Sequence, residues 1–132
     1  MHLSDISTEN DVILLVNTFY KHALSDTIIG VFFKNHISSS LEEHLPTMYD
    51  FWNSVLLSKG SYKGNPILTH VNLNKVKKLE KIHFERWLQL WNSTIDKLFA
   101  GQIAEQAKEK ASLMKDLMLY KIQSSQSGNF IQ

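Results

Sequence analysis

The sequence VKKLEKIHFERWLQLWNSTIDKLF at residues 76–99 has the clearest helical pattern in the chain. Its large apolar residues recur mostly every three or four positions, which is the spacing of one face of an α-helix. They are Leu79, Phe84, Trp87, Leu88, Trp91, Ile95 and Leu98. A stripe of this width is typical of a helix that packs against a core. The pattern therefore predicts a long amphipathic helix over residues 76–99.

One helix is predicted before this stretch and another after it. Apolar residues at helical spacing predict a helix over residues 9–24, with Thr8 placed to cap its first turn. Gly101 interrupts the chain, and a further helix is predicted over residues 102–122. The Ser/Gln-rich tail from residue 123 is expected to fray.

A fourth helix is predicted to end near residue 57, and its start has two alternatives. Ser40 and Glu43 have the spacing of a capping box, which favours a start near Leu41. Pro46 cannot donate a helical hydrogen bond, which favours a start near that residue instead. With four to six helices in all and no convincing strand, the prediction is one all-α domain over residues 1–132, and the pattern by itself fits either a bundle or a globin.

The composition excludes several classes of function. The 132 residues contain no cysteine, so disulfides and thiolate metal sites are excluded. The formal net charge of +1 gives no electrostatic reason to expect nucleic acid or an anionic membrane as a partner. We see no signal peptide and no apolar run long enough to span a membrane, and we expect a cytoplasmic protein.

No familiar enzyme motif is present, and the notable feature is histidine and aromatic residues on apolar faces. His44 shares a predicted helical face with Met48 and Phe51, and His70 lies in a short segment after a Gly- and Pro-containing loop. A haem pocket needs one neutral imidazole, a large apolar slot and a few polar donors. A histidine on an apolar face is nevertheless more often a hydrogen-bonded core residue, and aromatic residues at helical spacing are usually core.

Five short segments, in this order and spacing, carry a resemblance to a known family. They are FYK at 19–21, GVFF at 30–33, HLPTMYDFW at 44–52, YKGNP at 62–66, which leads to His70, and HFERWL at 83–88. Together they make the chain resemble the group III truncated haemoglobins over residues 12–118. The resemblance implies a globin-like, two-on-two helical sandwich around haem b, iron protoporphyrin IX held without covalent links.

The resemblance also implies roles for individual residues. His70 corresponds to the proximal iron ligand. On the distal side, Tyr20 and Trp87 correspond to the residues that donate to a bound ligand, and His44 to a histidine that gates the pocket. The residues expected to pack in the haem pocket are Phe33, Met48, Phe51 and Trp52. Leu41 departs from the family, which often has tryptophan there.

The function implied is reversible binding of oxygen and other diatomic gases, nitric oxide and carbon monoxide, at a pentacoordinate iron. Two distal donors would favour tight oxygen binding and would suit nitric oxide oxidation or peroxide turnover, with a reductase as partner. The rival hypothesis from another class is a helical protein-interaction domain without a cofactor. We expect neither nucleic acid nor membrane as a partner; a lysine cluster at residues 75–81 is the only feature that would favour nucleic acid.

Overall fold

The computed structural model describes residues 2–30, 41–59 and 79–126. Its regular elements in this part of the chain are four α-helices: α1 (Glu9–Ser25), α3 (Leu41–Leu57), α5 (Lys81–Leu98) and α6 (Gln102–Gln126). The predicted all-α class is confirmed. None of the described helices is both long and apolar enough to cross a membrane.

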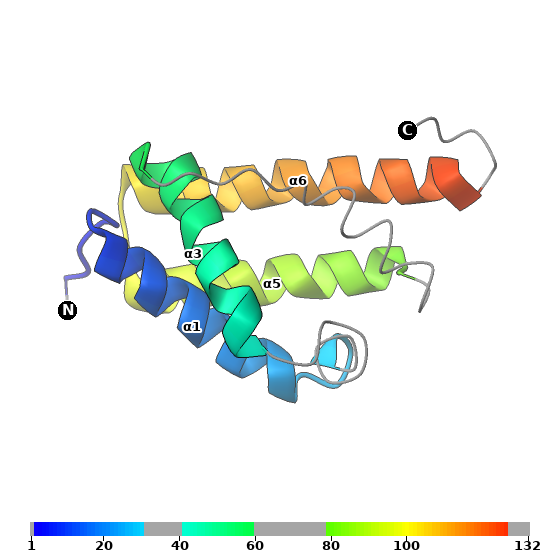
Figure 1. Cartoon of the computed structure of the whole chain (residues 1–132), viewed down its shortest axis with the longest axis horizontal. Helices are drawn as coiled ribbons and strands as arrows, with labels where there is room; N and C mark the ends of the chain where they lie inside the picture. The colour runs from blue at the N-terminus through cyan, green and yellow to red at the C-terminus, as the bar shows by residue number, and fades with distance from the viewer. Residues whose placement is uncertain (1, 31–40, 60–78, 127–132) are drawn as a thin grey trace.

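The four helices form two pairs (Figure 1). α5 and α6 run antiparallel through a tight connection, and the Trp91 indole of α5 donates to the Ala107 carbonyl of α6 at 3.2 Å. α1 packs against both α3 and α5. The Tyr49 hydroxyl on α3 donates to the Asn17 side chain on α1. The α1 and α3 pair thus lies across one end of the α5 and α6 pair.

α1 begins at the residue that its sequence predicts. Thr8 has extended backbone angles, and its hydroxyl accepts from the Asp11 N–H at 3.2 Å. The Asp11 carboxylate returns the interaction by accepting from the Thr8 N–H at 3.1 Å. This capping box satisfies N–H groups that a helix start leaves without partners. The predicted helix over residues 9–24 is confirmed to within one residue.

The first residue of α3 decides between the two helix starts that the sequence left open. The helix begins at Leu41 and continues through Pro46 to Leu57. Pro46 is exposed and costs the helix one backbone hydrogen bond without ending it. The helix ends where Ser58 takes a left-handed conformation with φ 55° and the Lys59 N–H donates to the Asn53 carbonyl at 3.1 Å.

α5 begins later than predicted, at Lys81 rather than at residue 76. Leu79 and Glu80 lie outside the helix, and Glu80 has extended backbone angles of φ −120° and ψ 168°. The Glu80 N–H donates to Nδ1 of His83 at 2.9 Å, so the first turn is capped by a side chain from within the helix. Apolar periodicity continued across this boundary because Leu79 is buried against α6 without being helical.

The first turn of α6 is capped by the carboxylate of a residue near the N-terminus of the chain. Asp5 accepts from the N–H groups of Ile103 at 2.9 Å and Ala104 at 2.8 Å. Partial burial acts to raise the pKa of Asp5, but backbone hydrogen bonds outweigh it and hold that pKa below its ordinary value. Gly101 has φ 148° and passes so close to Asp5 that a Cβ would overlap its side chain. α6 then continues past the predicted end at residue 122 to Gln126.

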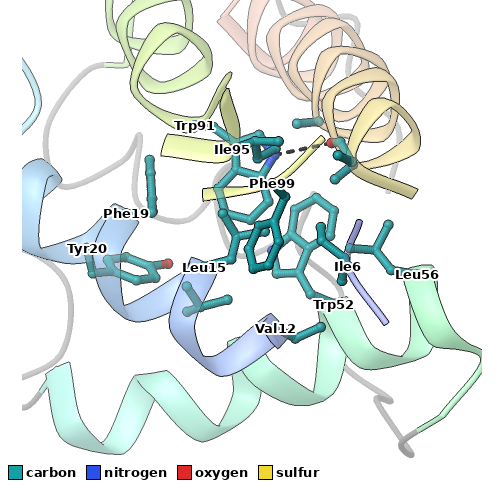
Figure 2. Packing of buried hydrophobic residues seen from close by; sticks show 14 of the residues in the cluster. Ile6, Val12, Leu15, Phe19, Tyr20, Trp52, Leu56, Trp91, Ile95 and Phe99 are labelled. Atoms are coloured by element: carbon teal, nitrogen blue, oxygen red, sulfur yellow. Dashed lines mark hydrogen bonds between the residues drawn. The ribbon is translucent and has the colours of Figure 1, made fainter. Parts of the chain in front are cut away.

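Aromatic rings form the centre of the core (Figure 2). Trp91 is 1% exposed, and its ring stacks on Trp52 of α3 with centroids 4.5 Å apart. Phe19 of α1 meets Trp91 edge to face at 5.3 Å. Three helices therefore join at one group of rings. A second apolar cluster joins Leu79, just before α5, and Phe84 of α5 to Met118 and Ile122 of α6.

Candidate functional site

Tyr20 is a buried phenol on the inner side of α1. Its side chain is 8% exposed, and its ring meets Phe19 edge to face at 5.0 Å. Burial raises the pKa of Tyr20 above its ordinary value, because a phenolate would lose its hydration. Tyr20 therefore keeps its proton at physiological pH. A protonated hydroxyl can donate a hydrogen bond to a polar ligand.

Trp87 lies one helical turn before Trp91 on α5, and its side chain is only half-buried. Its ring meets Phe19 edge to face with centroids 6.4 Å apart. Within the described part of the chain we find no hydrogen-bond acceptor for the Trp87 indole N–H. Phe19 is thus a shared ring neighbour of Tyr20 and Trp87, the two predicted distal donors, which come from different helices.

α3 supplies apolar side chains of two kinds. Phe51 and Trp52 are buried, and their rings meet edge to face at 5.1 Å. Trp52 stacks on Trp91 in the centre of the core. Met48 is half-buried and packs against the same core from its edge. Met48 thus lies at the edge of the core, whereas Phe51 and Trp52 are buried within it.

Several predicted site residues lie outside what the structure describes. His70 and Phe33 fall in ranges 60–78 and 31–40, which are outside the described residues. The backbone of α3 includes His44 and Leu41, but their side chains are not among those described. Their assigned roles stay predictions.

One interaction close to the predicted donors was missed in the sequence. Asp26, at the end of α1, accepts from Arg86 of α5 at 2.8 Å. The two residues are far apart in sequence, and each resembles an ordinary surface charge. The HFERWL segment contains Arg86 directly before Trp87, but nothing in that segment names its partner.

The described residues fit one side of the haem pocket that the resemblance implies. A porphyrin needs apolar contacts and a ligand on it needs donors, and this part of the chain offers Met48, Phe51, the buried hydroxyl of Tyr20 and the indole N–H of Trp87. Among the described residues there is no cluster of three or more metal-binding side chains.

Comparison with known proteins gives a consistent result. No family model matches the chain. The group 3 truncated haemoglobin of Campylobacter jejuni is 27% identical over 119 residues, which cover 86% of this chain and 91% of that protein. The crystal structure of a group III truncated haemoglobin from Campylobacter jejuni matches the fold with a TM-score of 0.81 at 22% identity, covering 92% of this chain and 95% of that one. The chain is thus similar in sequence to a group 3 truncated haemoglobin and has the fold of a group III truncated haemoglobin.

Proposed function

We propose that this protein binds haem b and uses it to bind oxygen, and also nitric oxide and carbon monoxide, reversibly. The truncated haemoglobin family implies a haem cofactor and binding of diatomic ligands. The observation that carries the proposal for this chain is the placement of Tyr20 and Trp87. They come from different helices, share Phe19 as a neighbour, and each presents one polar hydrogen on an otherwise apolar ring.

Each side chain has a defined task in this proposal. Bound haem would supply an iron that can bind a diatomic gas. His70 would hold the iron through a neutral imidazole nitrogen. Tyr20 and Trp87 would donate to the gas, and each hydrogen bond to a polarised acceptor is worth roughly 1.5–3 kcal/mol. Two donors would slow release of oxygen by on the order of 10²–10⁴-fold, which makes the protein a tight binder.

The remaining residues would shape the pocket. Met48 and Phe51 of α3 would contact the porphyrin together with Phe33, and Trp52 would support them from the core. An apolar wall excludes water, and this strengthens the hydrogen bonds from the two donors because the local dielectric constant is low. His44, one turn before Met48 on α3, would gate access from solvent.

The first experiment is an absorption spectrum of the purified, reduced protein with and without carbon monoxide. We expect a strong Soret band that shifts when carbon monoxide is added and is lost or altered in His70→Gly. A protein that stays colourless after reconstitution with haemin would contradict the proposal and favour a cofactor-free helical interaction domain.

The role of Tyr20 is tested by the oxygen dissociation rate. Tyr20→Phe keeps the ring that packs on Phe19 and removes only the hydroxyl. We expect oxygen to leave about 10- to 100-fold faster, because one donor is lost. An unchanged dissociation rate would contradict the assignment of Tyr20 as a donor.

Nitric oxide oxidation is the reaction that slow oxygen release favours. Nitric oxide, oxygen and one electron together make nitrate, so continued turnover needs a reductase, which we place with the protein in the cytoplasm. The test is nitrate formation when nitric oxide is added to the oxygen-loaded protein. Release of unreacted oxygen without nitrate would leave a binding protein and contradict this reaction. Peroxide turnover, the other reaction considered, is tested by consumption of hydrogen peroxide with an electron donor.

A further inference from the structure

Asp26 ends α1 with both of its carboxylate oxygens in use. Its side chain is 5% exposed. Oδ2 accepts from the N–H groups of Ile28 at 3.0 Å and Ile29 at 3.1 Å. Oδ1 accepts from Nε of Arg86 at 2.8 Å and lies 2.8 Å from its Nη2. One buried carboxylate therefore holds the turn after α1 and the first half of α5 at once.

Arg86 is held in place from its other side as well. Its Nη1 donates to the Gln89 side chain at 3.2 Å. The guanidinium is planar and presents its donors in fixed directions, so a contact on each side fixes the whole group. Residues Asp26, Arg86 and Gln89 form one hydrogen-bonded chain that reaches from the end of α1 to the middle of α5.

The turn that Asp26 holds is also close-packed. The Gly30 N–H donates to the Asp26 carbonyl at 3.0 Å. A Cβ on Gly30 would lie 2.8 Å from the Leu24 carbonyl oxygen, so only glycine fits without movement of α1. Asp26 and Gly30 therefore fix the turn after α1, and the contact of Asp26 with Arg86 fixes the position of α5 relative to that turn.

We propose that the Asp26–Arg86 pair is a positioning element for the distal donor Trp87. Tyr20 lies on the helix that Asp26 ends, and Trp87 directly follows Arg86. Along α1, the six residues from Tyr20 to Asp26 correspond to about 9 Å. α1 and α5 are thus joined at two levels, by Phe19 against Trp87 and by Asp26 against Arg86. This inference rests on the proposed function for what the donors bind, but the pair and its geometry do not depend on it.

The half-buried state of Trp87 is the reason that it needs such support. Trp91 is fixed by full burial, by stacking on Trp52 and by its bond to Ala107. Trp87 has the edge contact with Phe19 and no described hydrogen bond. Without the ion pair, the first half of α5 could shift against α1, and the Trp87 indole would move with it.

The direct test follows Trp87 in the fluorine NMR spectrum of protein labelled with 5-fluorotryptophan. The chain has 3 tryptophans, so the three resonances can be assigned by single substitutions to phenylalanine. In Arg86→Gln we expect the Trp87 resonance to shift or broaden while that of Trp91 stays in place. A Trp87 resonance that is unchanged in Arg86→Gln would overturn the proposal.

The matched control is Lys108→Gln, which removes another ion pair made by α5. Lys108 of α6 lies in contact with Asp96 near the end of α5, away from Trp87 in sequence. We expect the Trp87 resonance to be unaffected. An equal change in both variants would show that any weakening of α5 moves Trp87, and this too would overturn the specific role of the pair.

The second test is the oxygen dissociation rate. We expect Arg86→Gln to speed release by about 3- to 30-fold in the parent protein, since a misplaced donor loses much of its effect. In a Trp87→Phe background we expect no further change, because the donor being positioned is gone. Fully additive effects of the two substitutions would contradict positioning through Trp87.

A conservative variant separates positioning from simple loss of stability. Nε and Nη2 of Arg86 meet the same oxygen of Asp26, so a single ammonium group can take their place. We expect Arg86→Lys to recover most of the parent Trp87 resonance and dissociation rate. Failure of Arg86→Lys to recover either one, although it folds as stably as the parent, would contradict the proposal.

The two proposals fail in different ways. The fluorine spectrum reports on Trp87 whether or not the purified protein carries haem. A colourless protein whose Trp87 resonance still responds to Arg86→Gln would contradict the proposed function and support the positioning pair. A haem protein with an unresponsive Trp87 would do the reverse.

Discussion

Trp87 and Trp91 lie one turn apart on α5 and are equivalent in the amino-acid pattern, yet the fold treats them differently. Trp91 is 1% exposed, stacks on Trp52 and donates its N–H to Ala107. Trp87 is half-buried and touches Phe19 by its edge. The difference teaches that a position in a helical pattern does not decide whether an indole N–H is used inside the protein: among the described residues, that of Trp91 has an acceptor and that of Trp87 has none.

The supports of the two tryptophans differ in the same way. Trp91 is held by apolar packing between three helices, which is strong and insensitive to pH. Trp87 sits beside an ion pair, which depends on charge and geometry. We therefore expect substitutions at Trp91 to change stability and those at Trp87 to change ligand release.

The largest expected effect on stability is that of Trp91→Ala. We expect it to lower the free energy of unfolding by about 3–5 kcal/mol, because a buried ring is removed and a cavity is left. Trp87→Ala should cost clearly less, since that ring is half-exposed already. Urea denaturation of both variants measures the difference. Equal losses would break the distinction between the two residues.

The reverse order is expected for oxygen release. Trp87→Phe should speed dissociation by about 10- to 100-fold, since it removes one donor of roughly 1.5–3 kcal/mol. Trp91→Phe should leave the rate unchanged, because its N–H is committed to Ala107. Flash photolysis or stopped-flow mixing measures both rates. A faster release from Trp91→Phe would show that the core ring also controls the ligand.

Acid should act on the Trp87 side through Asp26. Burial acts to raise the pKa of this carboxyl, but hydrogen bonds and the Arg86 charge outweigh it and hold the pKa below its ordinary value of 3.8. A depressed pKa in the folded state contributes stability above about pH 3.8, and this is lost as pH falls through the lower folded value.

We therefore expect the free energy of unfolding to fall as the pH is lowered below about 3.8. Asp26→Asn should weaken that dependence, and the part that remains should come from Asp5 and Asp11, whose pKa values are also held low. Urea denaturation across the acid range measures the slope. If the free energy of unfolding of Asp26→Asn changes with pH as steeply as that of the parent protein, the ion pair does not stabilise the folded state.

The smallest effect is expected for Lys108→Gln, near the Trp91 end of α5. Asp96, its partner on α5, is 63% exposed in its side chain, so solvent screens the pair. We expect a loss of only about 0.2–1 kcal/mol in the free energy of unfolding. A larger loss in urea denaturation would mean that charge, and not apolar packing alone, holds this half of the helix.

Local signals in the sequence were sufficient for much of the fold. Thr8 and Asp11 cap α1 within four residues of chain, and the apolar spacing of α3, α5 and α6 identified each helix. The start of α5 was misplaced, because a buried Leu79 continues the apolar pattern outside the helix. Burial and helicity are separate properties, and periodicity detects the first of them.

The residues of the candidate site could be predicted from the sequence only in part. Tyr20 and Trp87 could be named from the resemblance, and their burial and shared contact with Phe19 agree with those assignments without testing them. The Asp26–Arg86 pair could not be predicted from the sequence, because each of these charged residues has many possible partners of opposite charge in the chain. Only packing of α1 on α5 selects this pair and buries its carboxylate, while Arg86 stays 35% exposed.

The sequence by itself determined the four helices that the structure describes and their amphipathic faces, because these follow from spacing and short-range capping, and it also carries the resemblance to a known family. The tertiary structure decided which partners the polar groups of the described residues take. Asp5 was committed to the start of α6, Asp26 to Arg86, and the Trp91 N–H to Ala107. Such commitments depend on contacts between residues far apart in the chain, which no local pattern encodes.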